Sequence, residues 1–365
     1  MGEPKRGWSY LELDTPALLL ELDAFEANVR LMAEFFADRP TSLRPHAKTH
    51  KCPEIACRQM KAGAIGITCA KVGEAEVMVE AGISDILIAN QVVGEIKIDR
   101  LTDLADRSAM MVAVDDAANV RQLSATCQAK GVTLRVLVEV DVGMHRCGVE
   151  PGGAALRLAQ EVAECSGLHL AGLMGYEGHL VQIRDPQERE SKVLEALAPL
   201  QETRDLLERH GLPVEIVSGG GTGTYDVSGS QPPMTEIEAG SYVFMDSTYS
   251  QTRPEFEQAL YVLSTIVSRP TPERLVTDAG RKTISNDFGN PVPIGVPGAL
   301  MKGLSEEHGV LTLDDPGMVH LRPGDKMRFV PSHCCTTTNL YDRLYVIRND
   351  ALVDVWPIAA RGRAQ

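Results

Sequence analysis

Short apolar runs alternate with longer amphipathic stretches between about residues 22 and 245. The apolar runs predict strands at Leu43–Lys48, Ala64–Ala70, Asp85–Asn90, Met111–Asp115, Leu134–Asp141, Leu168–Tyr176, Val214–Ser218 and Glu236–Phe244. The amphipathic stretches predict helices, among them Ala24–Phe36, Gly73–Ala81, Ala117–Lys130, Ala154–Cys165 and Glu188–His210. Eight strand–helix alternations over about 225 residues match the size of a (β/α)8 TIM-type barrel, an α/β fold. A doubly wound sheet is the alternative.

Beyond about residue 255 the pattern changes to shorter strand-like runs that Pro/Gly turns separate. These runs predict strands at Tyr261–Ile266, Arg274–Asp278, Val310–Leu313, Lys326–Pro331, Arg343–Arg348 and Leu352–Trp356. We therefore expect a barrel over residues 22–250 and a β-rich C-terminal domain over residues 251–365. Thr15–Leu22 reads as a strand that could join the second domain, so we expect residues 1–21 to belong to it.

Composition and charge limit the kind of partner. The chain has 365 residues, 44% of them hydrophobic and 24% charged, as in an ordinary soluble enzyme. A formal net charge of −14 argues against a nucleic-acid partner. Residues 1–8 lack the apolar core of a signal peptide, and no run approaches the roughly 18 apolar residues of a membrane helix. Eight scattered cysteines suggest reduced thiols and a cytoplasmic location.

The basic, imidazole-rich segment Arg44–Lys51 follows the apolar Leu43. A lysine at the C-terminal end of the first barrel strand lies at the mouth, where barrel enzymes carry out their chemistry. Such a lysine can form a Schiff base with a carbonyl cofactor when its surroundings lower its pKa. The alternative is a solvated cationic loop.

The glycine-rich segment Ser218–Thr224 follows the apolar run Val214–Val217. Glycines let backbone amides approach an anion closely, and the loop after the seventh barrel strand is a frequent phosphate site. No Gly-Lys-Ser/Thr follows, so this segment is not a Walker loop. We predict that it binds phosphate.

Three further side chains near the ends of predicted strands suggest chemistry. Arg146, in the loop after the fifth strand, could donate to a phenolate or carboxylate, or could bridge loops. Glu238, on the eighth strand, could keep a pyridine nitrogen protonated, or could form a salt bridge at the rim. His179, after the sixth strand, could act as a general base, or could be an ordinary loop histidine.

His333 and Cys335 lie in the predicted β domain. On a strand, residues two apart point to the same side, so this pair could share a metal while Cys334 points away. Imidazole with thiolate suits Zn²⁺, although Mn²⁺ is a second candidate. The alternative is a buried histidine beside buried thiols.

Taken together, these segments resemble the fold-type III pyridoxal-phosphate (PLP) enzymes. The branch is that of D-threonine aldolase and D-serine dehydratase, which is related to alanine racemase. The resemblance extends from Asp14 to about Trp356. It is carried by RPHAKTHK at 44–51, KVGEAE at 71–76, GMHRCG at 143–148, the glycines at 219–221 and PSHCC at 331–335. It implies an N-terminal barrel, a C-terminal β domain and a homodimer.

The resemblance also implies roles for individual residues. Lys48 would be the Schiff-base lysine, rather than Lys51, and Arg146 would contact the phenolate oxygen of the cofactor. Gly220, Gly221 and Thr222 would hold its phosphate, while His333 and Cys335 would bind a divalent metal. The other residues that we assign to the cofactor site are Tyr176, Ser218, Glu238 and Tyr242.

Two departures from the family pattern separate the candidate reactions. Cys335 stands where the aldolases usually carry aspartate and the D-serine dehydratases carry cysteine. The aldolases also place a histidine directly after an aromatic residue, whereas here Glu177 and Gly178 separate Tyr176 from His179.

We predict a PLP- and metal-dependent aldolase that cleaves a D-threonine-like substrate to glycine and an aldehyde, with His179 as base. A dehydratase that yields a 2-oxo acid and ammonia is the main alternative. A racemase is a lesser one; it would need a second acid such as Tyr176 or Tyr249. A PLP carrier without activity is disfavoured, because the β domain adds a metal-like pair.

Overall fold

The computed structural model describes residues 4–365. The expectation about a signal peptide concerns residues 1–8, of which residues 1–3 lie outside the described part. The chain divides into two compact units. The barrel unit consists of Met32–Lys48, Pro53–Gly240 and Gly362–Gln365. The β unit consists of the residues up to Leu31, Thr49–Cys52 and Ser241–Arg361.

The barrel unit contains one sheet of eight parallel strands in the order β2-β9-β8-β7-β6-β5-β4-β3. The strands are β2 (Ser42–Leu43), β3 (Ile67–Cys69), β4 (Asp85–Gln91), β5 (Ala109–Val114), β6 (Leu134–Glu139), β7 (Leu168–Gly175), β8 (Ile216–Gly219) and β9 (Glu236–Ile237). A parallel bridge between His46 and Thr68 joins the segment after β2 to β3, at the other end of this order. The sheet therefore curls on itself, which confirms the TIM-type barrel and rules out the open doubly wound sheet.

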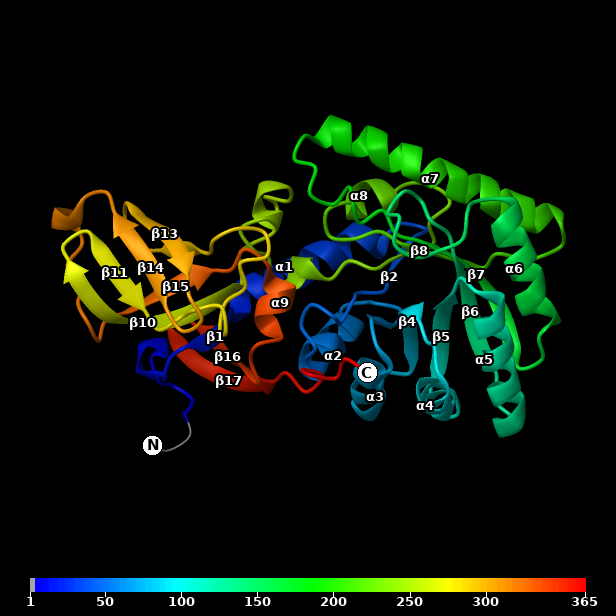
Figure 1. The fold of residues 1–365 in the computed structure, drawn as a ribbon, viewed down its shortest axis with the longest axis horizontal. Helices are drawn as coiled ribbons and strands as arrows, with labels where there is room; N and C mark the ends of the chain where they lie inside the picture. Colours follow the sequence, from blue (N-terminus) through cyan, green and yellow to red (C-terminus); the bar gives the residue numbers. More distant parts are fainter. Residues whose placement is uncertain (1–3) are drawn as a thin grey trace. The chain divides into compact units, whose positions relative to one another are not determined.

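Helices alternate with these strands along the chain (Figure 1). They are α1 (Leu22–Ala37), α2 (Pro53–Lys61), α3 (Val72–Glu80), α4 (Glu95–Ala105), α5 (Ala117–Lys130), α6 (Gly153–Glu164), α7 (Pro186–Arg209) and α8 (Tyr225–Ser228). Local sequence sets several ends. Asp116 caps α5 by accepting the Asn119 backbone N–H, and Gly131 ends the same helix in a left-handed conformation.

Two predicted barrel strands are much shorter in the structure. The first ends at Leu43, because the following segment contains Pro45, which has no N–H to donate. Beyond it, the Ala47 N–H donates to the Thr68 carbonyl and the Thr68 N–H donates to the Pro45 carbonyl. The eighth ends at Ile237; Glu238 still donates its backbone N–H to Gly219, after which Ser241–Val243 form a 3₁₀ helix, η2. The prediction that Glu238 lies on a strand is therefore wrong by one residue, and Tyr242 lies on η2.

The β unit contains a nine-stranded, mainly antiparallel sheet with the path β13-β14-β11-β10-β1-β16-β17; β15 pairs with β10 and β12. The strands are β1 (Ala17–Glu21), β10 (Leu260–Thr271), β11 (Arg274–Thr277), β12 (Val292–Ile294), β13 (Ala299–Leu304), β14 (Gly309–Leu313), β15 (Lys326–Val330), β16 (Arg343–Arg348) and β17 (Ala351–Pro357). β1 pairs antiparallel with β10 and parallel with β16, so the N-terminal strand does join this sheet. The sequence pattern did not predict β12 or β13.

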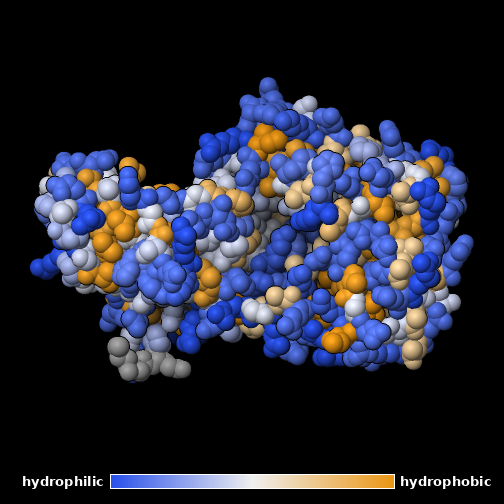
Figure 2. All heavy atoms as spheres, viewed as in Figure 1, coloured by the Kyte–Doolittle hydropathy of each residue, from blue (hydrophilic) through white to orange (hydrophobic). Residues whose placement is uncertain are grey.

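Both units are built around apolar cores. Leu87, Met111, Leu137 and Met174 belong to a buried cluster inside the barrel unit. Leu19, Leu263 and Ile347 belong to a second cluster, which packs in the β unit. Hydrophilic residues cover most of the face drawn in Figure 2, and hydrophobic residues appear there in scattered groups. Within residues 4–365, no helix combines the length and apolar character needed to span a membrane.

Candidate active site and metal-binding cluster

Two predicted cofactor residues, Lys48 and Arg146, both lie near the ring of Tyr176, directly after β7. The Lys48 Nζ atom lies 5.5 Å from the centre of the Tyr176 ring. The Arg146 Cζ atom lies 5.7 Å from the same centre. Both distances are within the range of cation–π attraction. Three loops that follow β2, β6 and β7 thus bring an amine, a guanidinium and a phenol ring together.

Backbone hydrogen bonds shape the loop that carries Arg146. The Asp141 Oδ1 atom accepts the backbone N–H groups of Gly143 at 2.9 Å and His145 at 3.0 Å. Partial burial opposes ionisation of this carboxyl, but these bonds prevail and lower the pKa of Asp141. The Asp115 Oδ2 atom accepts the Gly148 backbone N–H at 3.0 Å. Arg146 therefore lies on a loop that is fixed at both ends.

Glu139, the last residue of β6, is a buried acid that the sequence analysis missed. It accepts a hydrogen bond from the side-chain amide of Gln91, at the end of β4. Burial raises the pKa of Glu139, while Gln91 and Arg146 act in the opposite direction. A lone acid inside the otherwise apolar run from Val136 to Val140 was the signal that could have found it.

The glycine-rich loop passes against the same tyrosine. A Cβ atom on Gly221 would lie 3.5 Å from Tyr176 Cε2 and 3.4 Å from Val181 Cγ1. A Cβ atom on Gly223 would lie 1.9 Å from the Val181 carbonyl oxygen, so only glycine fits there. Thr222, between them, is 2% exposed. The predicted phosphate loop thus belongs to the same assembly as Lys48 and Arg146.

Glu177, also missed by the sequence analysis, is fully buried and accepts hydrogen bonds from the glycine-rich loop and from α8. Its carboxylate accepts Thr224 Oγ1 at 2.7 Å, Ser228 Oγ at 2.5 Å and the Gly220 backbone N–H at 3.2 Å. The Gly221 backbone N–H donates to Thr224 Oγ1 at 3.2 Å. The amides of Gly220 and Gly221 therefore have partners inside the protein. To bind phosphate as predicted, these two amides would have to give up their bonds to Glu177 and Thr224 and donate to phosphate oxygens instead.

Glu238 and Ser218 form a buried pair, in which Ser218 Oγ donates to Glu238 Oε1 at 2.9 Å. Burial raises the pKa of Glu238 to about 7, while Ser218 and the charge of Lys48 act in the opposite direction. A carboxyl group of this kind can share a proton with a pyridine nitrogen near neutral pH. The structure thus gives Glu238 an environment that suits its predicted role.

The last two predicted residues outside the metal pair are His179 and Tyr242. His179 is exposed, and its ring faces Gly143, where a Cβ atom would lie 3.3 Å from its Cε1 and Nε2 atoms. It therefore lies beside the loop that carries Arg146. Tyr242 is fully buried in the β unit, with its ring centre 5.9 Å from that of Phe256.

In the β unit, one nitrogen or sulfur atom each of His333, Cys334 and Cys335 lie within 4.8 Å of one another. The predicted strand geometry is wrong, because β15 ends at Val330 and Cys334–Thr338 form a short helix, α9, with His333 as its N-cap. The turn at the start of α9 keeps the Cys334 thiol near the pair instead of on the opposite side.

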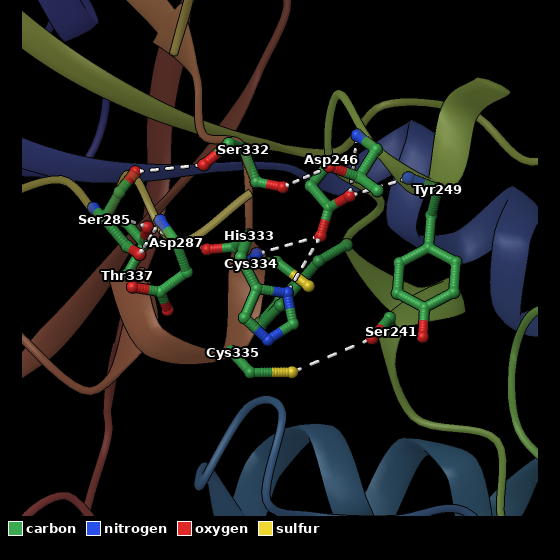
Figure 3. A network of polar contacts seen from close by, with 12 residues as sticks. Ser241, Asp246, Tyr249, Ser285, Asp287, Ser332, His333, Cys334, Cys335 and Thr337 are labelled. Carbon is green, nitrogen blue, oxygen red and sulfur yellow. Dashed lines mark hydrogen bonds and ion pairs between the residues drawn. The ribbon is translucent and has the colours of Figure 1, made fainter. Parts of the chain in front are cut away.

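Asp246 lies beside this cluster and was not predicted. It is fully buried, and its Oδ2 atom lies 3.5 Å from His333 Nδ1 (Figure 3). Burial disfavours a charged imidazole, but interactions with Asp246 and Cys335 prevail and raise the pKa of His333 to about 10. An acid directly after the apolar run from Tyr242 to Met245 was the only sequence signal for it.

Hydroxyl groups surround the Cys335 thiol. Its Sγ atom lies 3.2 Å from Thr49 Oγ1 and 3.7 Å from Ser241 Oγ. A hydrogen bond from Cys334 lowers the pKa of Cys335 well below its usual range, against the effect of burial. Imidazole, thiolate and a nearby carboxylate form a donor set that suits a borderline-soft divalent ion such as Zn²⁺. Thr49 directly follows Lys48 in the chain.

Two family models and several known proteins match this chain. Residues 20–248 match the model "Alanine racemase, N-terminal domain", and residues 259–347 match "Putative serine dehydratase domain". The chain is 42% identical to a D-threonine aldolase of Arthrobacter sp. over 96% of this chain and 93% of that one. It is 37% identical to a 3-hydroxy-D-aspartate aldolase of Paracoccus denitrificans over 98% and 94% of the two chains.

Among solved structures, D-threonine aldolase from Filomicrobium marinum superposes with a TM-score of 0.97 at 42% identity, with both chains covered completely. The similarity therefore includes both units and the segments that carry Lys48, Arg146 and His333.

Proposed function

Because the chain belongs to the fold-type III PLP enzymes of the D-threonine aldolase and D-serine dehydratase branch, we propose that it is a carbon–carbon lyase. Its reaction is the cleavage of a β-hydroxy-D-amino acid, D-threonine or a close analogue, to glycine and an aldehyde. The observation that carries the proposal is the placement of Lys48 and Arg146 over the Tyr176 ring, with Gly221 against its edge.

The residues around Tyr176 fit PLP. Lys48 supplies the amine that links to the aldehyde carbon, and Arg146 supplies the cation for the phenolate oxygen. The buried Glu238, with its pKa raised to about 7, can keep the ring nitrogen protonated. Gly220, Gly221 and Thr222 would hold the phosphate, and Ser218 orients Glu238. When bound, PLP supplies an electron sink for the bond that breaks at the α-carbon of the substrate.

His333 and Cys335 would hold a zinc ion. When bound, the ion supplies a Lewis acid that acidifies a hydroxyl group. We propose His179 as the base, because its exposed imidazole lies beside the Arg146 loop. It would accept the β-hydroxyl proton, so that the hydroxyl becomes a carbonyl as the Cα–Cβ bond breaks.

A dehydratase is the second candidate, and two observations favour it. The C-terminal family model carries a serine dehydratase name, and a cysteine, Cys335, stands at the proposed second metal position. In this reaction Lys48 would remove the α-proton and the β-hydroxyl would leave. The two relatives described above are both named as aldolases, which supports the first candidate.

We also propose a cytoplasmic homodimer. Within the described residues all eight cysteines are free thiols, which supports a reducing compartment. Dimerisation rests on the family alone.

A product assay tests the reaction. Purified protein with PLP and Zn²⁺ is given D-threonine and D-serine separately, and we expect glycine and acetaldehyde from D-threonine without ammonia. Ammonia with a 2-oxo acid would instead establish the dehydratase. Racemised substrate without either set of products would contradict both proposals.

Replacing His179 tests the proposed base. We expect His179→Ala to lower kcat on D-threonine by about 10²- to 10⁴-fold, the usual contribution of a general base. His169→Ala is a matched control, because His169 is also an exposed histidine of the β7 segment but lies at its other end. A fully active His179→Ala enzyme would exclude His179 as the base.

A further inference from the structure

Asp246 has the position of a residue that orients a metal-binding histidine. We infer that its Oδ2 atom accepts the Nδ1–H of His333 and thereby leaves the Nε2 atom of the imidazole as the metal-binding nitrogen. This inference rests on the metal site of the proposed function and adds a positioning residue to it. Asp246 itself would not bind the metal; it would orient His333, which with Cys335 would bind it.

The Asp246 carboxylate is a fixed acceptor. Its Oδ1 atom accepts the backbone N–H groups of Tyr249 at 2.8 Å and Thr248 at 3.1 Å. Its Oδ2 atom accepts the backbone N–H of Cys334 at 2.9 Å. The side chain is 0% exposed, so water does not compete for these oxygens. Three peptide groups from two chain segments therefore hold the carboxylate beside His333.

The imidazole ring is held from a second side. The Phe288 ring centre lies 4.6 Å from that of His333, with an interplanar angle of 56°. Figure 3 shows one ring nitrogen directed to Asp246 and the other directed toward the Cys335 side. Among the described residues, the buried Nδ1 atom has no hydrogen-bond partner, and the Asp246 Oδ2 atom lies 3.5 Å from it. A small closure of this gap on metal binding would complete the bond.

The position of the proton on His333 decides which of its nitrogens can bind a metal. A histidine binds a metal through the lone pair of one nitrogen, and an acceptor at the other nitrogen fixes the proton there. Loss of such an outer partner typically weakens metal binding by about 10- to 100-fold. The alternative role for Asp246 is purely structural, as an anchor for the turn at Thr248 and Tyr249.

Asp246→Asn separates the two roles. The asparagine has nearly the same shape, and its oxygen can still accept the backbone N–H groups of Thr248 and Tyr249, while the Cys334 N–H loses its acceptor. Its NH₂ group would face His333 as a donor and favour the imidazole form that carries its proton on Nε2. We expect the zinc affinity of the PLP-loaded protein to fall about 10- to 100-fold without substrate present, measured by competition with a chromophoric chelator.

Thr248→Val is the matched control. It removes the 2.8 Å hydrogen bond from Thr248 Oγ1 to the Ser332 carbonyl in the same turn, but leaves Asp246 and His333 in place. We expect this variant to bind zinc like the wild type. Equal losses of zinc affinity in Thr248→Val and Asp246→Asn would show a structural role and overturn the inference.

Cys335→Ala distinguishes failure of the inference from failure of the proposed metal site. Wild-type zinc affinity in Cys335→Ala would mean that zinc binds elsewhere, which overturns both. Loss of zinc in Cys335→Ala with wild-type affinity in Asp246→Asn would overturn only the role of Asp246.

A measurement on the unaltered protein covers the case in which Asp246→Asn does not fold. A long-range ¹H–¹⁵N spectrum of the zinc-loaded protein with ¹⁵N-labelled histidine should show the His333 proton on Nδ1. The His333 signal is the one absent from a His333→Gln spectrum. A proton on Nε2 would overturn the inference.

Discussion

Three buried carboxylates, Glu177, Glu238 and Asp246, show what a single residue contributes to the site. Each lies just after a strand or an apolar run, and each accepts hydrogen bonds that fix neighbouring groups. Burial makes such acids sensitive to their partners, because an uncompensated charge in a low-dielectric site is costly. Glu238 shows this cost directly, because burial raises its pKa to about 7 although the Ser218 hydroxyl donates to its carboxylate.

At the residue scale, Glu238 predicts a pH-dependent stability. Its pKa rises from 4.5 to about 7 on folding, because burial disfavours the carboxylate. The folded state therefore binds the proton more tightly, so this stabilisation is complete below pH 4.5 and is lost as pH rises through 7. In the PLP-free protein we expect Glu238→Gln to exceed the wild type in unfolding free energy by on the order of 3 kcal/mol at pH 8.

Urea unfolding at pH 5 and pH 8 measures the effect, and the difference between Glu238→Gln and wild type should be smaller at pH 5. Glu190→Gln serves as the control, because Glu190 is exposed on α7. The same difference for Glu238→Gln at both pH values would contradict the assigned cause.

At the element scale, local sequence predicted the ends of helices, but it did not predict the conformation of the loops at the site. Asp116 and Gly131 place both ends of α5 as predicted. In contrast, the prediction that His333 and Cys335 share one side of a strand is wrong, because α9 begins at Cys334, directly after His333. The glycine-rich loop was recognised, but its support by Glu177 was not, since that carboxylate lies 43 residues from Gly220 in the chain.

Glu177→Gln tests this support of the glycine-rich loop. A neutral amide has a single acceptor oxygen and turns an NH₂ donor toward groups that also donate. We expect a loss of about 2 kcal/mol in unfolding free energy, together with weaker retention of PLP. Urea unfolding and the rate of PLP release on dialysis measure these two effects.

Ser230→Ala is the control for Glu177→Gln, because Ser230 is exposed just beyond α8 and should leave both quantities unchanged. Wild-type PLP retention in Glu177→Gln would show that the loop holds its shape without the charge.

At the scale of the whole barrel unit, Arg44 links two strands across the point where the sheet closes. Its side chain is 3% exposed and bonds Glu236 at 2.9 Å and Asp85 at 2.7 Å. These acids are the first residues of β9 and β4, which lie on either side of β2 and β3, where the sheet closes. The guanidinium passes so close to Gly66 that a Cβ atom there would lie 2.0 Å from Arg44 Nη1. Arg44 therefore serves the barrel structure, although it opens the motif that contains Lys48.

Arg44→Met should destabilise the barrel strongly. It leaves the buried Glu236 carboxylate without its cation, which typically costs about 3–5 kcal/mol. Arg135→Met is the comparison, because Arg135 also bonds Asp85, at 2.8 Å, but is 27% exposed; we expect a loss of about 1 kcal/mol or less. Urea unfolding of both variants measures the difference. Equal losses would mean that burial of the Arg44 pair adds nothing.

The sequence by itself determined the barrel, the β-rich second part, the N-terminal strand that joins it and the motifs around Lys48, Arg146 and His333. These features depend on hydrophobic periodicity and on short segments, which local sequence encodes. Only the tertiary structure revealed the buried acids that hold those motifs. Glu177 and Asp246 act on groups 43 and 88 residues away. No local pattern specifies which distant donor will face a carboxylate, because packing of the whole unit decides it.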